Sequence, residues 1–140
     1  MNRVTKISAW LAMGLFIASA LAIFPGAAAA QTLDISIESE TGGSPPGELV
    51  LTDPAGDRTG PETTDIHRRN PMSGLYNLRV IGRKTGVYIL FLKAYTASGS
   101  TSDVRFPHMN IKNGEIHHYD VNFSAEGPKL DVRRTRVTTE

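Results

Sequence analysis

The sequence predicts an all-β protein: an antiparallel immunoglobulin-like β-sandwich of about seven strands that follows an N-terminal signal peptide. Three observations predict it. Apolar and polar residues alternate with a period of two in several short stretches. Glycine, proline, asparagine and aspartate separate these stretches at intervals of about 8–12 residues. Beyond residue 30 no helical period is visible, and 110 residues suffice for one domain.

The first thirty residues have the pattern of a secretory signal peptide. Arg3 and Lys6 form a basic head, an uncharged apolar run extends over 7–24, and residues 27–30 are four alanines. We expect cleavage before Gln31, a mature domain over 31–140, and a secreted or periplasmic location. The alternative is an uncleaved membrane anchor, because the apolar run is near the lower limit for spanning a bilayer.

Composition excludes several classes of function. The full chain has 15 basic and 14 acidic residues, and loss of Arg3 and Lys6 would leave 13 and 14, a net charge of −1. Such a balance gives no electrostatic footprint for nucleic acid. The chain has no cysteine, which excludes disulfides, thiolate zinc sites, a cysteine nucleophile and a lipid-modified cysteine. The apolar core alone must therefore stabilise the domain.

The first two strands are expected at 33–37 and 48–52. Leu33, Ile35 and Ile37 alternate with polar residues, as in a half-buried strand. A glycine- and proline-rich turn at 42–47 separates these strands, and 53–57 forms the next turn. The connection from Asp53 to Ser73 is then expected to be a long loop.

Residues 74–80 and 86–92 are predicted to form a hairpin. A turn centred on Lys84 would make Val80 face Tyr88, Leu78 face Leu90 and Tyr76 face Leu92. All six apolar residues would then share one face.

A second hairpin is predicted at Asn113-Gly114, a dipeptide suited to a two-residue turn. Its register would pair Val104 with Phe123, Phe106 with Val121 and His108 with Tyr119. Because Pro107 cannot donate a backbone hydrogen bond, strand 103–111 is expected at a sheet edge or with a bulge. Residues 129–137 are expected to form the last strand, with Arg133, Arg134 and Arg136 guarding an edge.

These strands predict the core. Its expected members are Tyr76, Leu78, Val80, Tyr88, Leu90 and Leu92, with Phe106, Tyr119, Val121 and Phe123.

Four stretches, which together cover most of 49–124, also carry a family resemblance. They are 52–60, 74–82 with its Gly-x-Tyr-x-Leu-x-Val-x-Gly spacing, 86–95, and 114–124 with Tyr-x-Val-x-Phe-Ser. They resemble uncharacterised bacterial secreted β-sandwich modules, which are similar to the C-terminal modules appended to secreted peptidases. The resemblance implies an extracytoplasmic accessory or interaction module. Residues 61–72 depart from the pattern.

Metal sites are weakly signalled. The second hairpin would place His108 and His117 as diagonal neighbours on one face, with His118 on the opposite face. The 53–73 connection offers carboxylates to calcium but lacks the spacing of a calcium loop. Those carboxylates belong to Asp53, Asp57 and Asp65. We expect no metal and no other cofactor.

Two candidate binding regions remain. The basic cluster His67, Arg68 and Arg69 would suit an acidic glycan or a phosphate group, unless it is simply a solvated loop. The outer face of the first hairpin is unusually apolar for a sandwich strand and forms either a partner surface or a face covered by the chain itself. The partner-surface residues are Ile81, Val87, Ile89 and Phe91.

No motif for catalysis is present: there is neither a Gly-x-Ser-x-Gly elbow nor a His-Glu-x-x-His helix. We therefore expect an exported, non-catalytic binding or structural module rather than an enzyme. Its expected partner is another exported protein or a glycan, and neither nucleic acid nor, after cleavage, a membrane. The alternatives are a carbohydrate- or ion-binding module that uses loops at the end of the sandwich, and a small secreted hydrolase.

Overall fold

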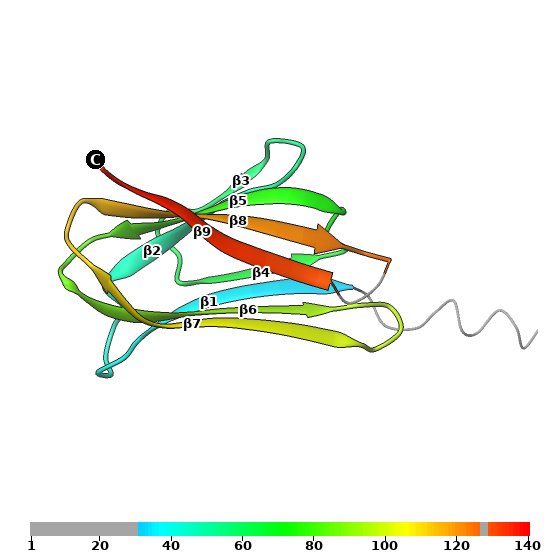
Figure 1. Cartoon of the computed structure of the whole chain (residues 1–140), viewed down its shortest axis with the longest axis horizontal. Helices are drawn as coiled ribbons and strands as arrows, with labels where there is room; N and C mark the ends of the chain where they lie inside the picture. Colours follow the sequence, from blue (N-terminus) through cyan, green and yellow to red (C-terminus); the bar gives the residue numbers. More distant parts are fainter. Residues whose placement is uncertain (1–30, 127–128) are drawn as a thin grey trace, which may run out of the picture.

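The computed structural model describes residues 31–126 and 129–140, which form an antiparallel β-sandwich of two sheets (Figure 1). The predicted all-β fold is confirmed. The signal peptide predicted for residues 1–30 lies outside the described residues and stays a prediction. Within the sandwich domain no helix is long and apolar enough to cross a bilayer. The strands are β1 (Thr32–Ser39), β2 (Gly47–Thr52), β3 (Arg58–Thr59), β4 (Asp65–Arg69), β5 (Gly74–Gly82), β6 (Gly86–Tyr95), β7 (Thr101–Ile111), β8 (Glu115–Ser124) and β9 (Lys129–Thr139).

The strands divide into a four-stranded sheet, β4-β1-β6-β7, and a five-stranded sheet, β3-β2-β5-β8-β9. All seven strands predicted from the sequence are present. The prediction of a long loop over 53–73 is wrong, because this segment contains β3 and β4. Ile66 explains β4: it pairs with Ile35 of β1 and is only 3 % exposed, so its burial holds the strand against the sheet.

The two predicted hairpins are wrong. β5 and β6 lie in different sheets, where β5 pairs with β2 and β8, and β6 pairs with β1 and β7. Likewise β7 pairs with β6, and β8 pairs with β5 and β9. The connections at 83–85 and 112–114 therefore cross from one sheet to the other. They meet at one end of the sandwich, where the Gly114 N–H donates to the Gly82 carbonyl at 2.9 Å.

Strand β7 confirms the expectation drawn from Pro107. It is the last strand of its sheet and also has a bulge. Tyr88 pairs with Met109 and Leu90 with Phe106, so β7 has one residue more than β6 over this interval. His108, inside the bulge, has a positive φ of 54°.

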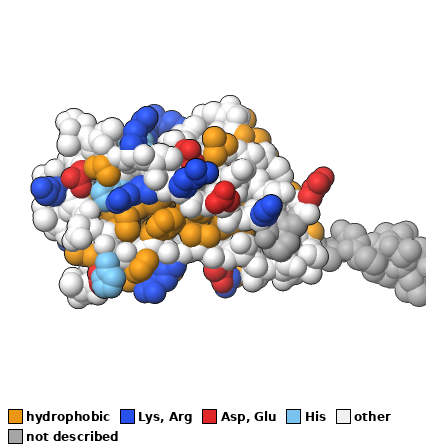
Figure 2. Space-filling model, in the orientation of Figure 1, with side chains coloured by type: hydrophobic (Ala, Val, Ile, Leu, Met, Phe, Trp, Pro, Cys, Tyr) orange, Lys and Arg blue, Asp and Glu red, His pale blue; other side chains and the backbone are white. Residues whose placement is uncertain are grey.

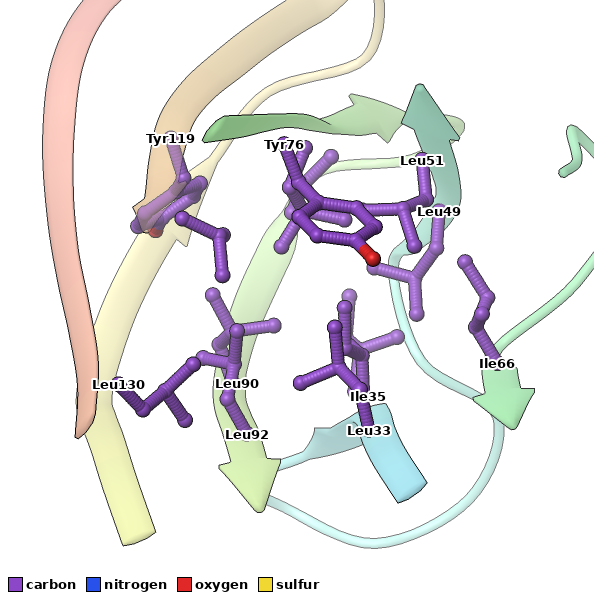
Figure 3. Packing of buried hydrophobic residues seen from close by; sticks show 14 of the residues in the cluster. Leu33, Ile35, Leu49, Leu51, Ile66, Tyr76, Leu90, Leu92, Tyr119 and Leu130 are labelled. Carbon is purple, nitrogen blue, oxygen red and sulfur yellow. The ribbon is translucent and has the colours of Figure 1, made fainter. Parts of the chain in front are cut away.

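The predicted core is confirmed, although its strands face each other across the sandwich and not along hairpins. Side chains of both sheets point toward one another between the layers (Figure 3). All of the predicted core residues are buried except Phe106, which is partly buried and packs against the cluster.

The two lateral edges of the sandwich differ. On one side, residues 60–64 cross from the five-stranded to the four-stranded sheet and bond to both. The Leu49 N–H of β2 donates to the Thr63 carbonyl at 2.8 Å, and the Ile37 N–H of β1 donates to the Thr64 carbonyl at 3.1 Å. This side is closed. On the other side lie the edge strands β7 and β9, which no hydrogen-bonded crossing of the described chain connects.

Gly60 is the first residue of the 60–64 segment, and a substitution at this position tests how much the segment contributes to stability. Its φ is 97°, and a Cβ there would lie 2.1 Å from the Leu49 carbonyl oxygen. We expect Gly60→Ala to lower the free energy of unfolding by about 3 kcal/mol or more, through combined strain and overlap. The matched control is Gly56→Ala, whose φ of 96° is similar but whose surroundings are open. It should cost only about 1–2 kcal/mol. Equal losses in urea titrations would contradict the close approach of this segment to β2.

Candidate functional site

Four polar side chains form a hydrogen-bonded network that extends from the core to the surface at Glu115. The Tyr88 hydroxyl, from the four-stranded sheet, lies 2.7 Å from His117 Nδ1 and 2.8 Å from the Tyr119 hydroxyl, both of the other sheet. His117 Nε2 lies 3.1 Å from Glu115 Oε1. His117 alternates with Tyr119, Val121 and Phe123 along β8, and this period of two is the sequence signal that it faces inward.

The direction of each bond follows from Glu115. An ionised carboxylate only accepts, so His117 Nε2 carries the proton and donates it. In the neutral imidazole Nδ1 then accepts from the Tyr88 hydroxyl, which in turn accepts from Tyr119. The network thus has one consistent set of donors and acceptors and links the two sheets.

The environment favours these protonation states. Burial lowers the pKa of His117, although the hydrogen bond to Glu115 opposes this effect. That same bond, donated by His117, lowers the pKa of Glu115. Burial raises the pKa of Tyr88 and of Tyr119, so both hydroxyls stay protonated.

The network resembles a proton relay, but three of its four members are closed to solvent. Tyr88 and Tyr119 are 0 % exposed and His117 is 1 % exposed, whereas the Glu115 side chain is 23 % exposed. We interpret the network as a structural link between the sheets.

The placement of His108 and His117 as diagonal neighbours on one face is wrong. His117 lies in the core, whereas His108 lies on edge strand β7, where its Nδ1 is 2.5 Å from Glu40 Oε1. The error comes from the incorrect second hairpin. His118 does point away from His117, with Nε2 2.8 Å from the Thr138 hydroxyl. Over residues 31–126 and 129–140, no group of three His, Asp or Glu residues could hold a metal ion.

The basic cluster 67–69 is divided by strand alternation. His67 and Arg69 lie on one face of β4, with His67 paired to Asp34. Arg68 lies on the other face, 2.5 Å from Asp53 Oδ2 and 3.0 Å from the Thr59 hydroxyl. The three side chains therefore do not converge on one site.

Asp53 is a turn residue. Its Oδ1 accepts from the backbone amides of Ala55 and Asp57, both at 2.9 Å. Burial raises its pKa, but these amides and Arg68 outweigh that effect and lower the pKa overall. Asp57 is exposed and Asp65 lies on β4, so the three aspartates suggested for calcium are not gathered.

The structure separates the predicted partner-surface residues. Ile81 is buried on β5, in the five-stranded sheet, while Val87, Ile89 and Phe91 are half-buried on the outer face of β6. The guanidinium of Arg105 stands over the Phe91 ring at 5.7 Å. The remaining apolar face is therefore one strand wide and partly covered by the chain itself.

A broader apolar region lies at the unclosed side of the sandwich, which we call the open edge. Here the inward-facing residues of β7 and β9 have no strand between them. Figure 2 shows a band of hydrophobic side chains along this edge, with Lys and Arg side chains above and below it. Its apolar residues are Val104, Phe106 and Met109 of β7, which are half-buried, and Val132 and Val137 of β9, of which Val137 is 46 % exposed.

The basic side chains of β9 form no ion pair with a described carboxylate. β9 carries four basic residues and one acidic residue, a net charge of +3, whereas residues 31–140 together carry −1. The sequence indicated Arg133, Arg134 and Arg136 as edge residues. It did not indicate the apolar band beside them, because Phe106 was expected in the core and Val104 was expected to pair with Phe123 in a hairpin.

No protein-family model, curated protein or solved structure that was compared matches this chain. The immunoglobulin-like class and the resemblance to secreted peptidase-appended modules therefore stay predictions.

Removing the Tyr88 hydroxyl tests the buried network. In Tyr88→Phe, His117 Nδ1 and the Tyr119 hydroxyl lose their shared partner while remaining buried. We expect a loss of about 1–3 kcal/mol in the free energy of unfolding. Tyr95→Phe, on the outer face of the same strand, should cost less than about 0.5 kcal/mol. Comparable losses for both variants in denaturant titrations would show that the network does not stabilise the fold.

Stability should also depend on pH through His117. Its pKa is lowered in the folded state, so below its unfolded pKa of about 6.5 the unfolded chain binds more protons. Stability should be complete above that pH and decrease as the pH falls toward the folded pKa. His118, whose pKa burial also lowers, acts in the same direction.

We therefore expect a lower melting temperature at pH 5.0 than at pH 7.5, and a smaller difference in His117→Gln. A variant with an unchanged pH profile, or a native protein that becomes more stable in acid, would contradict this account.

Proposed function

We propose that this chain is an exported, non-catalytic interaction module that binds a partner protein through its open edge. The observation that carries the proposal is the asymmetry of the sandwich. Residues 60–64 close one side by bonding to both sheets, and the other side leaves apolar residues of two strands accessible. Apolar surface between unpaired strands is a common feature of protein-binding sites.

Export is supported by the sequence alone. A basic head, an apolar run and an alanine segment precede Gln31, and the sandwich begins directly after it at Thr32. Cleavage before Gln31 would leave every strand of the sandwich intact.

The placement of chemically reactive side chains supports a non-catalytic role. His117 is sealed in the core, and His67 and His108 are paired with carboxylates at separate places on the four-stranded sheet. A hydrolase would need a nucleophile and a base in contact within an accessible pocket.

The open edge is also a better candidate than the outer face of β6. Val87, Ile89 and Phe91 come from a single strand, and Arg105 covers the Phe91 ring. At the open edge, residues from two strands of different sheets lie side by side, and β7 and β9 are in contact.

Site-specific photo-crosslinking in the cells that produce the protein tests this proposal. A photoreactive phenylalanine analogue is placed at Val104 or Val137 on the open edge, and at Arg58 or Arg69 on the opposite edges of the same two sheets. We expect a discrete crosslinked protein from the open-edge positions alone, and an exported form whose intact mass corresponds to Gln31–Glu140. Crosslinking that is absent, or equally strong from Arg58 and Arg69, would refute the proposed binding region. A protein retained with residues 1–30 would refute export in soluble form.

A further inference from the structure

Among the described residues, strand β9 has one long side without a hydrogen-bonded neighbour. It is the last strand of the five-stranded sheet, extends from Lys129 to Thr139, and in this part of the chain pairs with β8 alone. A strand in this position offers backbone N–H and C=O groups to another chain. β7, the neighbouring edge, is less suited because Pro107 lacks a donor and the bulge interrupts its ladder.

The regular part of β9 is Lys129–Arg134. The register against β8 shifts after Arg134, and Thr135 is the extra residue of a bulge. Six residues before that bulge match the usual length of a strand, about 5–6 residues. An added strand would therefore pair with Lys129–Arg134.

Side chains of this stretch alternate between two environments. Leu130, Val132 and Arg134 lie on the inward side, where Leu130 and Val132 pack with the core, whereas Lys129, Asp131 and Arg133 lie on the outward side and are exposed. An added strand would continue this alternation. Its inward residues would cover Val132 and Val104 and lie beside Arg134, and its outward residues would lie beside Lys129, Asp131 and Arg133, of which two are basic and one is acidic.

Charge indicates the partner. β9 carries a net charge of +3 in a domain whose total is −1, and its basic side chains lack ion pairs with described carboxylates. Self-pairing of two β9 strands would place two strands of net charge +3 side by side, which is less favourable than pairing with an acidic strand. An acidic strand would neutralise them and would be selected over neutral or basic strands.

We propose that the β9 edge binds an extended acidic segment of a partner protein, in which acidic and apolar residues alternate, as an additional antiparallel or parallel strand. This inference rests on the proposed function and specifies its partner. The basic residues of β9 then have two effects: they prevent self-association and they select the ligand.

A model peptide tests the inference. A fluorescein-labelled peptide of about ten residues that alternates Glu and Val is titrated with the exported protein, and binding is followed by fluorescence anisotropy. Two control peptides carry Lys in place of Glu, or N-methyl groups on alternate backbone nitrogens, which prevent strand addition. The test variant is Arg133→Glu/Arg134→Glu. Its matched control is Arg58→Glu/Arg69→Glu, an equal charge reversal at exposed residues on the opposite edges.

We expect saturable binding of the Glu-Val peptide alone, and weaker binding in about 0.3 M salt than in about 0.05 M salt. Arg133→Glu/Arg134→Glu should weaken binding at least about tenfold, and the opposite-edge variant should change it less than about twofold. If the test variant fails to fold, the N-methylated peptide and the salt titration decide the question on the unchanged protein.

Equal binding of the N-methylated peptide, equal loss in both double variants, or no binding at millimolar concentration would overturn the inference. Failure here together with crosslinking at Val104 and Val137 would leave the open edge as a binding region for a partner of different chemistry. Failure of both experiments would remove the proposed function as well.

Discussion

The structure depends on the way in which its two sheets are joined. Five connections join the sheets, at 40–46, 60–64, 70–73, 83–85 and 112–114. Of these, residues 60–64 close one lateral side, and the connections at 83–85 and 112–114 meet at one end. The Tyr88–His117 bond adds a polar link inside the core. Nothing comparable joins β7 to β9 within the described chain, so the apolar interior remains accessible there. The open edge and its half-buried residues Val104 and Val132 result from this asymmetry.

The sequence predicted which residues are buried far better than which strands pair. Alternation assigned Tyr76, Leu90 and Val121 to the interior, where each is 0 % exposed. Alternation could not show which strands pair, because a hairpin and a crossing between the sheets both place the same residues inside. The crossing brings Gly82 close to a residue distant in sequence: a Cβ at Gly82 would lie 2.1 Å from the Lys112 carbonyl oxygen. No local pattern contains that information. Strand β4 was missed for a related reason, since one buried isoleucine between charged residues is a weak signal.

The candidate sites were predicted less well, because each required side chains from separate strands to converge. The pairing of His108 with His117 depended on a hairpin that does not form. The 67–69 cluster was expected on a loop, but these residues belong to strand β4, where side-chain alternation separates Arg68 from His67 and Arg69. Charge was read more successfully, since Arg133, Arg134 and Arg136 do lie on an edge strand. The sequence suggested that these arginines only guard an edge, whereas the apolar band beside them favours a binding edge (Figure 2). A basic edge that only prevents aggregation needs no accessible interior next to it, whereas a binding edge does.

Amide hydrogen exchange measured by NMR tests most directly whether β9 accepts another strand. Exchange is recorded for the protein with and without saturating Glu-Val peptide. We predict that alternate amides within Lys129–Arg134, those directed away from β8, exchange rapidly in the free protein and become protected in the complex. Amides of β3 and β4 should not change. Protection confined to β3 and β4, or unchanged exchange along β9 at saturation, would contradict the account.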